Sequence, residues 1–144
     1  MSLSLKKSLG QNFLIDRNII KLITKEGNIN HEDRIIEVGP GDGALTESIL
    51  EKKPNELIVI EKDDRLVNIL KDKFNNKITI INEDMMKIQY EYYLKKNLLI
   101  FGNLPYNIST QILAKWIKIR NLEKFCKKLV LMFQKEVADR IIAK

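Results

Sequence analysis

The fold is constrained most by the way short apolar runs alternate with segments whose apolar residues recur at helical spacing. The apolar runs predict five strands, at 34–38, 56–61, 77–82, 97–101 and 128–133. Helical spacing and capping residues predict helices at 17–26, 44–52, 64–74, 109–117 and 135–143, whereas 85–96 is expected to be a helix or an irregular link. Strands that are joined through helices pair in parallel, so we predict one α/β sheet with helices on both faces.

Two helices allow an expectation about which residues face the core. In the first helix, Ile19, Ile20, Leu22 and Ile23 are expected to point inward. In the fourth helix, Trp116 stands at core spacing, which is typical of packing rather than of a surface for stacking on a base.

Composition limits the class of protein. The chain has 144 residues, of which 44% are hydrophobic and 31% charged, as expected of one soluble globular domain. No apolar run approaches the roughly 18 residues of a membrane span, and no secretory signal is evident, so a cytoplasmic location is expected. With one cysteine, Cys126, and one histidine, His31, no disulfide framework and no metal site are expected.

The charge balance favours an acidic partner. The 25 Lys and Arg residues outnumber the 19 Asp and Glu residues, which gives a net charge of +6. Such a balance is weakly indicative of nucleic acid. The basic pairs, such as Lys95-Lys96, are scattered along the chain, and each by itself is typical of solvated surface. Nothing points to a membrane or to an obligate protein partner.

A glycine-rich segment, "EVGPGDGALT" at 37–46, follows the first strand and leads into a helix. Gly39, Gly41 and Gly43 lack the Cβ atoms that would keep a ligand away from the backbone, and the helix start offers N–H groups. In open α/β sheets the ligand lies beyond the carboxyl ends of the strands. The segment therefore predicts a cofactor loop rather than a simple tight turn.

Two cofactor classes fit this loop. It satisfies the Gly/Ala form of the dinucleotide fingerprint, and Glu61, at the end of the second strand, suits the ribose hydroxyls of either cofactor. Glu37 completes an E-x-G-x-G-x-G pattern, which enzymes that use S-adenosylmethionine (SAM) favour. Asp84, after the third strand, is suited to accept the adenine amino hydrogen of SAM. These features favour SAM and leave an NAD-dependent oxidoreductase as the disfavoured alternative.

The segment "GNLPYN", after the fourth strand, predicts a clamp for a planar amine. The exocyclic amine of adenine is a poor nucleophile because its lone pair is delocalised, and acceptors on its N–H groups stabilise the charge that develops during transfer. Asn103 offers a side-chain carbonyl and Leu104 a main-chain carbonyl, which Pro105 orients by restricting the backbone. Tyr106 is suited to stack on a flipped base. A dehydrogenase has no use for this segment.

Taken together, these motifs resemble the ribosomal RNA adenine N6,N6-dimethyltransferase family. The matching stretches are "GQNFL" (10–14), "EVGPGDGALT" (37–46), "IEKD" (60–63), "NED" (82–84), "GNLPYNIST" (102–110) and "FQKEVADRI" (133–141). "GPG" and Leu104 are more similar to the small-subunit enzymes, the kasugamycin-sensitivity dimethylases, than to the macrolide-resistance methylases. The resemblance implies dimethylation of two adjacent adenosines near the 3′ end of small-subunit (16S) ribosomal RNA, on immature 30S particles, during ribosome biogenesis.

The resemblance also implies a fold and a set of site residues. The fold is a Rossmann-like class I SAM-dependent methyltransferase with sheet order 3-2-1-4-5. The SAM contacts implied by the family fall on Asn12, Leu14, Gly39, Glu61, Asp84 and Asn103, beside Gly41 of the loop, and the catalytic segment falls on Asn103, Leu104, Pro105 and Tyr106.

The same resemblance carries an expectation about domain organisation. Residues 1–144 are expected to form the SAM-binding domain without its last two strands, and the helical RNA-binding domain of the family is expected to be absent. The fifth strand is then an edge strand. This leaves a second function open, that of a non-enzymatic, methylase-like RNA-binding module in ribosome assembly or transcription.

Overall fold

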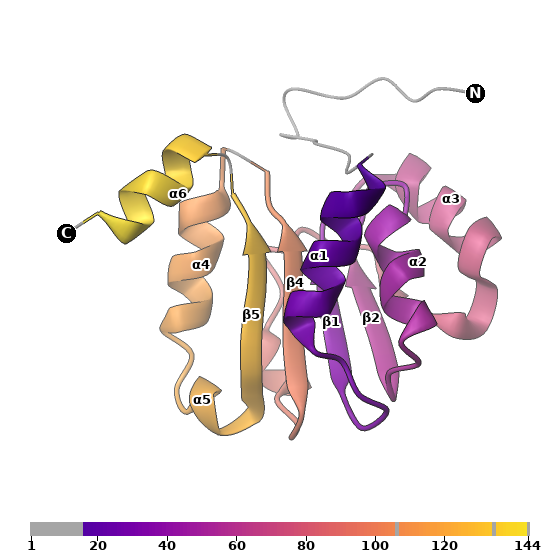
Figure 1. Ribbon diagram of the computed structural model, residues 1–144, viewed down its shortest axis with the longest axis horizontal. Coiled ribbons are helices and arrows are strands. Elements are labelled where there is room, and N and C mark those ends of the chain that lie inside the picture. Colours follow the sequence, from indigo (N-terminus) through magenta and orange to yellow (C-terminus); the bar gives the residue numbers. More distant parts are fainter. Residues whose placement is uncertain (1–15, 106, 134, 144) are drawn as a thin grey trace.

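The structure is a computed structural model that describes residues 16–105, 107–133 and 135–143, and it contains a parallel sheet with helices on both faces (Figure 1). The strands are β1 (Arg34–Val38), β2 (Glu56–Ile60), β3 (Thr79–Ile81), β4 (Leu98–Asn103) and β5 (Cys126–Met132). Their order in the sheet is β3-β2-β1-β4-β5 and all neighbours pair in parallel. The predicted fold class and strand order are confirmed.

Helices connect the strands. They are α1 (Arg17–Gly27), α2 (Ala44–Glu51), α3 (Asp64–Phe74), α4 (Ser109–Ile117), α5 (Leu122–Phe125) and α6 (Lys135–Ile142), with short 3-10 helices η2 (Asn75–Lys77) and η3 (Tyr90–Tyr93). Two aspartates set the starts of long helices: Asp16 accepts the N–H of Asn18 at 2.8 Å, and Asp63 accepts the N–H of Arg65 at 2.9 Å. Among the helices of the described residues, none is long and apolar enough to cross a membrane.

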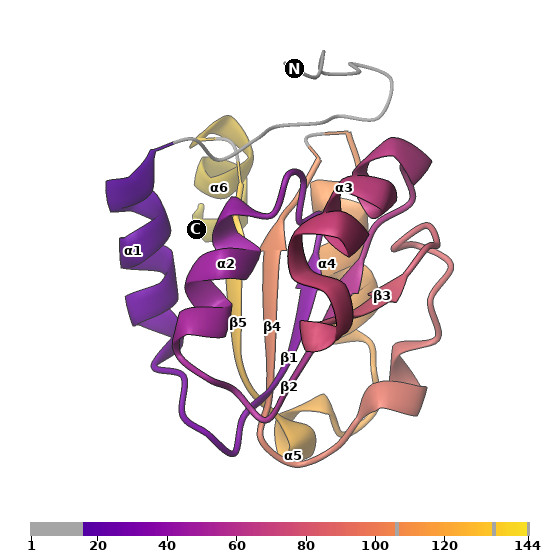
Figure 2. The same ribbon diagram turned by 90° about the vertical axis from the view of Figure 1, so that its right-hand side faces the viewer.

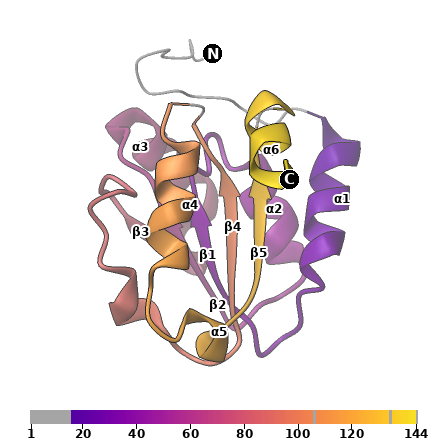
Figure 3. The ribbon, with the colours of Figure 1, turned by 90° about the vertical axis from the view of Figure 1, so that its left-hand side faces the viewer.

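The sheet separates two apolar cores. On one face, α1, α2 and α3 pack against alternate residues of β1, β2 and β4, such as Ile35, Val59 and Phe101. On the other face, α4 and the segment around η3 cover the intervening residues, with Trp116 fully buried against Tyr90. Figures 2 and 3 show α1 and α4 on opposite sides of the sheet. Trp116 therefore packs, as its spacing predicts.

The strand register brings the carboxyl ends of the central strands to one edge. Val38 of β1 pairs with Ile60 of β2 and Gly102 of β4, and Asn103 pairs with Met132 of β5. The segments that follow β1, β2 and β4 therefore begin side by side. We call this side of the sheet the carboxyl edge and the opposite side the amino edge.

Local predictions need correction in α1 and β4. In α1, Ile20 and Ile23 are buried, but Ile19 is 47% and Leu22 57% exposed, because Ile20, Ile23, Thr24 and Gly27 form the narrow i, i+3, i+4, i+7 stripe that reaches the core. β4 runs two residues past the predicted strand, since β5 pairs with it as far as Asn103. Of the two alternatives for 85–96, the irregular link is confirmed, and it contains η3. The short helix α5 lies where no element was predicted.

Candidate active site at the carboxyl edge of the sheet

The glycine loop after β1 takes a backbone shape that other residues rarely adopt. Gly39, Gly41 and Gly43 have φ values of +69°, +58° and +92°, in the left-handed region that favours glycine. The N–H of Gly39 donates to the carbonyl of Ile60 at 3.2 Å, which ties the loop to the end of β2. The loop therefore lies over the central strands at the carboxyl edge.

Gly39 also brings this loop against the motif after β4. A Cβ atom at Gly39 would lie 2.7 Å from the main-chain oxygen of Asn103, and 3.9 Å from Cε of Met85. Any side chain at this position would collide with the backbone of the motif. The absent Cβ thus lets three segments that are remote in the sequence meet at one point of the edge.

Glu61 follows β2 directly and lies at the same edge. Its carboxylate accepts the N–H of Asp63 at 3.0 Å, and its own N–H donates to the carbonyl of Ile81 at 3.0 Å. Burial raises the pKa of Glu61 above its usual value, an effect opposed by the N–H groups of Asp63 and Gly41. The link to Gly41 places the carboxylate beside the glycine loop.

Asp84 follows β3 and is half-buried. Its Oδ1 accepts the N–H of Met86 at 2.9 Å, while Nζ of Lys62 lies 3.8 Å from Oδ2. The segment around Asp84 is anchored from α4, because Nζ of Lys115 donates to the carbonyl of Met86 at 2.6 Å. Sequence reasoning missed this anchor, since a lysine in a helix carries no local signal of its partner.

The Asn-Leu-Pro segment leaves the sheet between β4 and α4. Asn103 is the last residue of β4 and is half-buried, whereas the Leu104 side chain is buried in the core shared with α4. The N–H of Leu104 lies 3.4 Å from the carbonyl of Met132. The Pro105 carbonyl accepts the N–H of Ile108 at 3.2 Å, in a turn that leads into α4. The backbone of the segment is thus fixed at both ends.

The structure brings Gly39, Gly41, Glu61, Asp84 and Asn103 to the carboxyl edge, but the roles predicted for them stay predictions. Asn12, Leu14 and Tyr106 lie outside the described residues. Within the described part of the chain, no group of three or more His, Cys, Asp or Glu side chains could hold a metal ion.

Sequence reasoning named Glu37 as part of the E-x-G-x-G-x-G pattern but missed that this acid is buried and paired with a hydroxyl of α2. Glu37, next to last in β1, is 1% exposed and Thr46 of α2 is 0% exposed. The Thr46 hydroxyl donates to Oε1 of Glu37 at 2.6 Å. The signal was present, because the two residues are the ends of "EVGPGDGALT", but their pairing depends on how α2 returns over β1.

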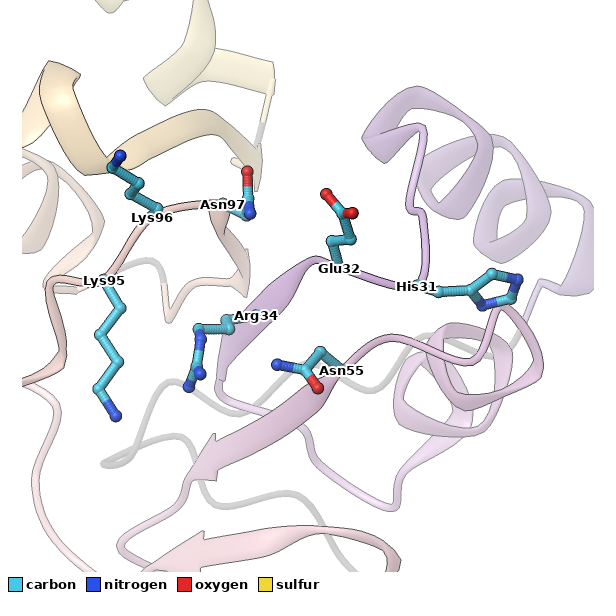
Figure 4. A pocket seen from close by; sticks show the side chains of 7 residues that line it. All are labelled: His31, Glu32, Arg34, Asn55, Lys95, Lys96 and Asn97. Atoms are coloured by element: carbon cyan, nitrogen blue, oxygen red, sulfur yellow. The ribbon is translucent and has the colours of Figure 1, made fainter.

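The amino edge has a different character. A pocket of about 470 Å³ opens there, lined by His31, Glu32, Arg34, Asn55, Lys95, Lys96 and Asn97. Figure 4 shows Arg34 between Lys95 and Asn55. The Arg34 guanidinium is already paired, at 2.7 Å, with Glu56 of β2. This pocket stands at the opposite ends of the strands from the glycine loop, and it belongs to a separate surface.

Comparison with known proteins connects the carboxyl edge to a family. A family profile described as ribosomal RNA adenine dimethylase matches residues 2–144. The ribosomal RNA small subunit methyltransferase A of Pelagibacter ubique is 52% identical over 99% of this chain and 54% of its own length. The protein of that name from Hydrogenobaculum is 44% identical over 95% of this chain and 52% of its own length. The chain thus spans about half the length of the curated relatives it matches.

Solved structures agree with this result. A dimethyladenosine transferase from Plasmodium falciparum superimposes with a TM-score of 0.79 and 29% identity, over 92% of this chain and 47% of its own. The 23S rRNA methyltransferase ErmE superimposes with a TM-score of 0.74 over 89% of this chain and 50% of its own, and its 23% identity supports a shared fold. The resemblance drawn from the motifs is confirmed, and the chain belongs to the ribosomal RNA adenine dimethylase family.

Proposed function

We propose that this chain is the catalytic part of a SAM-dependent enzyme that dimethylates N6 of two adjacent adenosines near the 3′ end of small-subunit ribosomal RNA, on immature subunits. Membership of the family and 52% identity to a ribosomal RNA small subunit methyltransferase A support the proposal. The net charge of +6 suits an RNA partner. As proposed, residues 1–144 form the SAM-binding domain of such an enzyme.

The residues at the carboxyl edge fit SAM. The glycine loop presents backbone without side chains, and the Glu61 carboxylate beside Gly41 is an acceptor for two ribose hydroxyls. The Asp84 carboxylate, held after β3, is an acceptor for the adenine amine of the cofactor. The bound cofactor would supply a methyl group on a sulfonium, which passes to the target amine as that amine loses a proton.

The residues after β4 would act on the target base. The Asn103 side-chain carbonyl and the Leu104 main-chain carbonyl would accept the two hydrogens of the adenine N6 amine and hold its lone pair toward the cofactor. Pro105 keeps the backbone of Leu104 extended. Tyr106, from the family resemblance, would stack on the flipped base.

The single observation that carries this proposal is the contact between the glycine loop and the motif. Only at a glycine can the backbone at position 39 approach the Asn103 carbonyl, where a Cβ would lie 2.7 Å from that oxygen. The cofactor loop and the amine-binding segment are therefore adjacent, as methyl transfer between two bound groups requires.

The test is Asn103→Ala in this chain, assayed for methyl transfer to small subunits that lack the modification. We expect a loss of at least about 100-fold in turnover, as for removal of one acceptor from a preorganised site. Calorimetric titration should find SAM affinity within a few-fold of the unaltered chain. Asn68→Ala, at an exposed position of α3, is the matched control and should change neither quantity.

Two outcomes would contradict the proposal. Normal turnover in the Asn103 variant would remove Asn103 from the mechanism. An absence of SAM binding by the unaltered chain would favour the non-enzymatic RNA-binding module, provided that circular dichroism shows a folded protein.

A further inference from the structure

The buried pair of Glu37 and Thr46 has no part in the proposed chemistry, although it lies directly beneath the glycine loop. Glu37 stands two residues before Gly39, and Thr46 is in the first turn of α2, which begins after the loop ends at Gly43. The 2.6 Å bond from the Thr46 hydroxyl to Glu37 therefore joins the two ends of the loop. Figure 2 shows α2 lying along the sheet to which β1 belongs. It covers the same face as α1 and α3.

Burying the Glu37 carboxylate lowers the stability of the fold, so stability alone does not explain it. A carboxylate that is 1% exposed has lost its hydration, and one hydroxyl only partly compensates it. Burial raises the pKa of Glu37 to about 7, the Thr46 bond lowers it, and the charge of Glu61 raises it further. An apolar residue would fill the same core position without this cost.

The groups that face Glu37 come from the neighbouring elements. On β2, Val59 pairs beside it and Glu61 follows at the strand end; on β4, Phe101 pairs beside it. The first turn of α2 contributes the Thr46 hydroxyl. Among the described residues, Glu61 is the charged group that acts on Glu37. Two acids thus repel each other at the edge where the glycine loop lies.

We propose that Glu37 is a positioning residue for the cofactor, which holds the glycine loop in its binding shape through Thr46 and whose charge, with that of Glu61, favours a cationic ligand over a neutral one. The inference rests on the proposed function, because SAM is the cationic ligand in question. The methylated form carries a sulfonium, whereas the demethylated product S-adenosylhomocysteine has a neutral sulfur.

This proposal fixes the direction of a pH effect. A cation at the edge stabilises the ionised form of both acids, so binding of SAM releases protons and strengthens as pH rises through the range in which Glu37 ionises. The affinity for the neutral product S-adenosylhomocysteine should increase less over the same pH range. The sulfonium makes the amino group of SAM more acidic than that of the product, so the two ligands titrate differently by themselves. The part of the effect that belongs to Glu37 is therefore the part that disappears in Glu37→Gln, where the titration of the ligands is unchanged.

The experiment is calorimetric titration of the full chain with SAM and with S-adenosylhomocysteine at about pH 6 and about pH 8. In the unaltered chain, the preference for SAM should increase at least about threefold between the two conditions. Glu37→Gln keeps an acceptor for the Thr46 hydroxyl but has no charge, so most of that increase should disappear while binding persists.

The positioning role is tested by removing the hydroxyl. Thr46→Val should weaken SAM binding roughly tenfold, the size expected for one lost hydrogen bond to a charged group, and Thr46→Ser should restore it. The control is Thr24→Val, which removes a buried hydroxyl that contacts Ser48 at 2.8 Å between α1 and α2. That variant should lose thermal stability but keep SAM affinity within about twofold.

Three results would count against these proposals. If Thr46→Val and Thr24→Val affect SAM affinity alike, or if Glu37→Gln leaves the pH effect intact, the positioning role is overturned while the proposed function stands. If the folded, unaltered chain binds no SAM, both proposals fail. If Thr46→Val does not fold, Thr46→Ser and Glu37→Gln still decide the matter.

Discussion

Two buried acids, one near each end of β1, differ in the partners that surround their carboxylates. Asp33, just before β1, is 0% exposed, and its carboxylate accepts Nζ of Lys127 at 2.6 Å and the N–H of Asn30 at 2.8 Å. Glu37, near the other end, has a hydroxyl partner and a second acid as its charged neighbour. Asp33 is neutralised by a cation of the chain, whereas the described residues offer Glu37 no ion pair.

The two ends of β1 therefore differ in role: the acid at the amino edge takes part in an ion pair that holds the fold together, and the acid at the carboxyl edge lies at the candidate site. At the amino edge, the Asp33–Lys127 pair fastens β5 to the loop before β1, and Nζ of Lys128 reaches the carbonyl of Glu26 at 2.7 Å, at the end of α1. At the carboxyl edge the acids gather around a loop of left-handed glycines. A buried acid whose pKa is raised by burial and by a neighbouring acid, next to a loop of this kind, is a reason to expect a functional site there.

The largest effect is expected from Gly39→Ala, which should distort the site at the carboxyl edge and leave the amino edge unchanged. The φ of +69° strains an alanine, and its Cβ would meet the rigid main-chain oxygen of Asn103. We expect SAM affinity to fall at least about 100-fold, measured by calorimetry, with about 2 kcal/mol lost from the free energy of unfolding.

The control for that variant is Gly27→Ala, where the added methyl group meets the ring of Phe101 instead of backbone. It should lower the melting temperature but leave SAM affinity within about threefold. Equal losses of affinity in the two variants would show that the carboxyl edge is merely sensitive to any loss of stability.

The next effect is a pH dependence of stability that originates at Glu37. Because its pKa is raised from 4.5 to about 7 in the folded chain, the folded state binds the proton more tightly than the unfolded state does. The stabilisation is therefore present below the unfolded pKa and lost as pH rises through about 7, and it amounts to about 3 kcal/mol.

Urea unfolding across that pH range measures this loss. The free energy of unfolding of the unaltered chain should fall relative to that of Glu37→Gln as pH rises. A parallel course of the two curves would mean that Glu37 does not titrate in this range.

A smaller effect is expected at the amino edge, from Lys127→Met. It leaves the Asp33 carboxylate buried without its cation. The Lys127 side chain is partly exposed, so water compensates in part, and we expect about 2 kcal/mol of destabilisation instead of the roughly 3–5 kcal/mol of a fully buried pair. SAM affinity should not change. Lys124→Met, at an exposed position of α5, is the control for removing a lysine.

The smallest effect is expected at the pocket of the amino edge. Lys95 and Lys96 are exposed, so replacing both by Gln should change the free energy of unfolding by no more than about 0.5 kcal/mol. SAM affinity should stay the same, since the pocket lies at the far ends of the strands. A large loss of affinity would show that the amino edge and the carboxyl edge are coupled.

Most of the fold could be predicted from the sequence because its signals are local. β1 has the predicted bounds, and Asp16 and Asp63 precede α1 and α3 as capping residues should. The local signal was insufficient in α1, where four apolar residues compete for a stripe that two of them occupy. Which side of a helix meets the sheet depends on its neighbours, here α2 and β5.

The candidate site divides in the same way. The sequence by itself determined the alternation of elements, the glycines after β1 and the acids and amides that end successive strands, because periodicity and backbone preference act over a few residues. Only the tertiary structure decided that Gly39 meets the Asn103 carbonyl, that Thr46 returns to Glu37, and that Lys127 reaches Asp33 across 94 positions of the chain. Such contacts depend on strand order and register, which arise from the packing of the whole sheet.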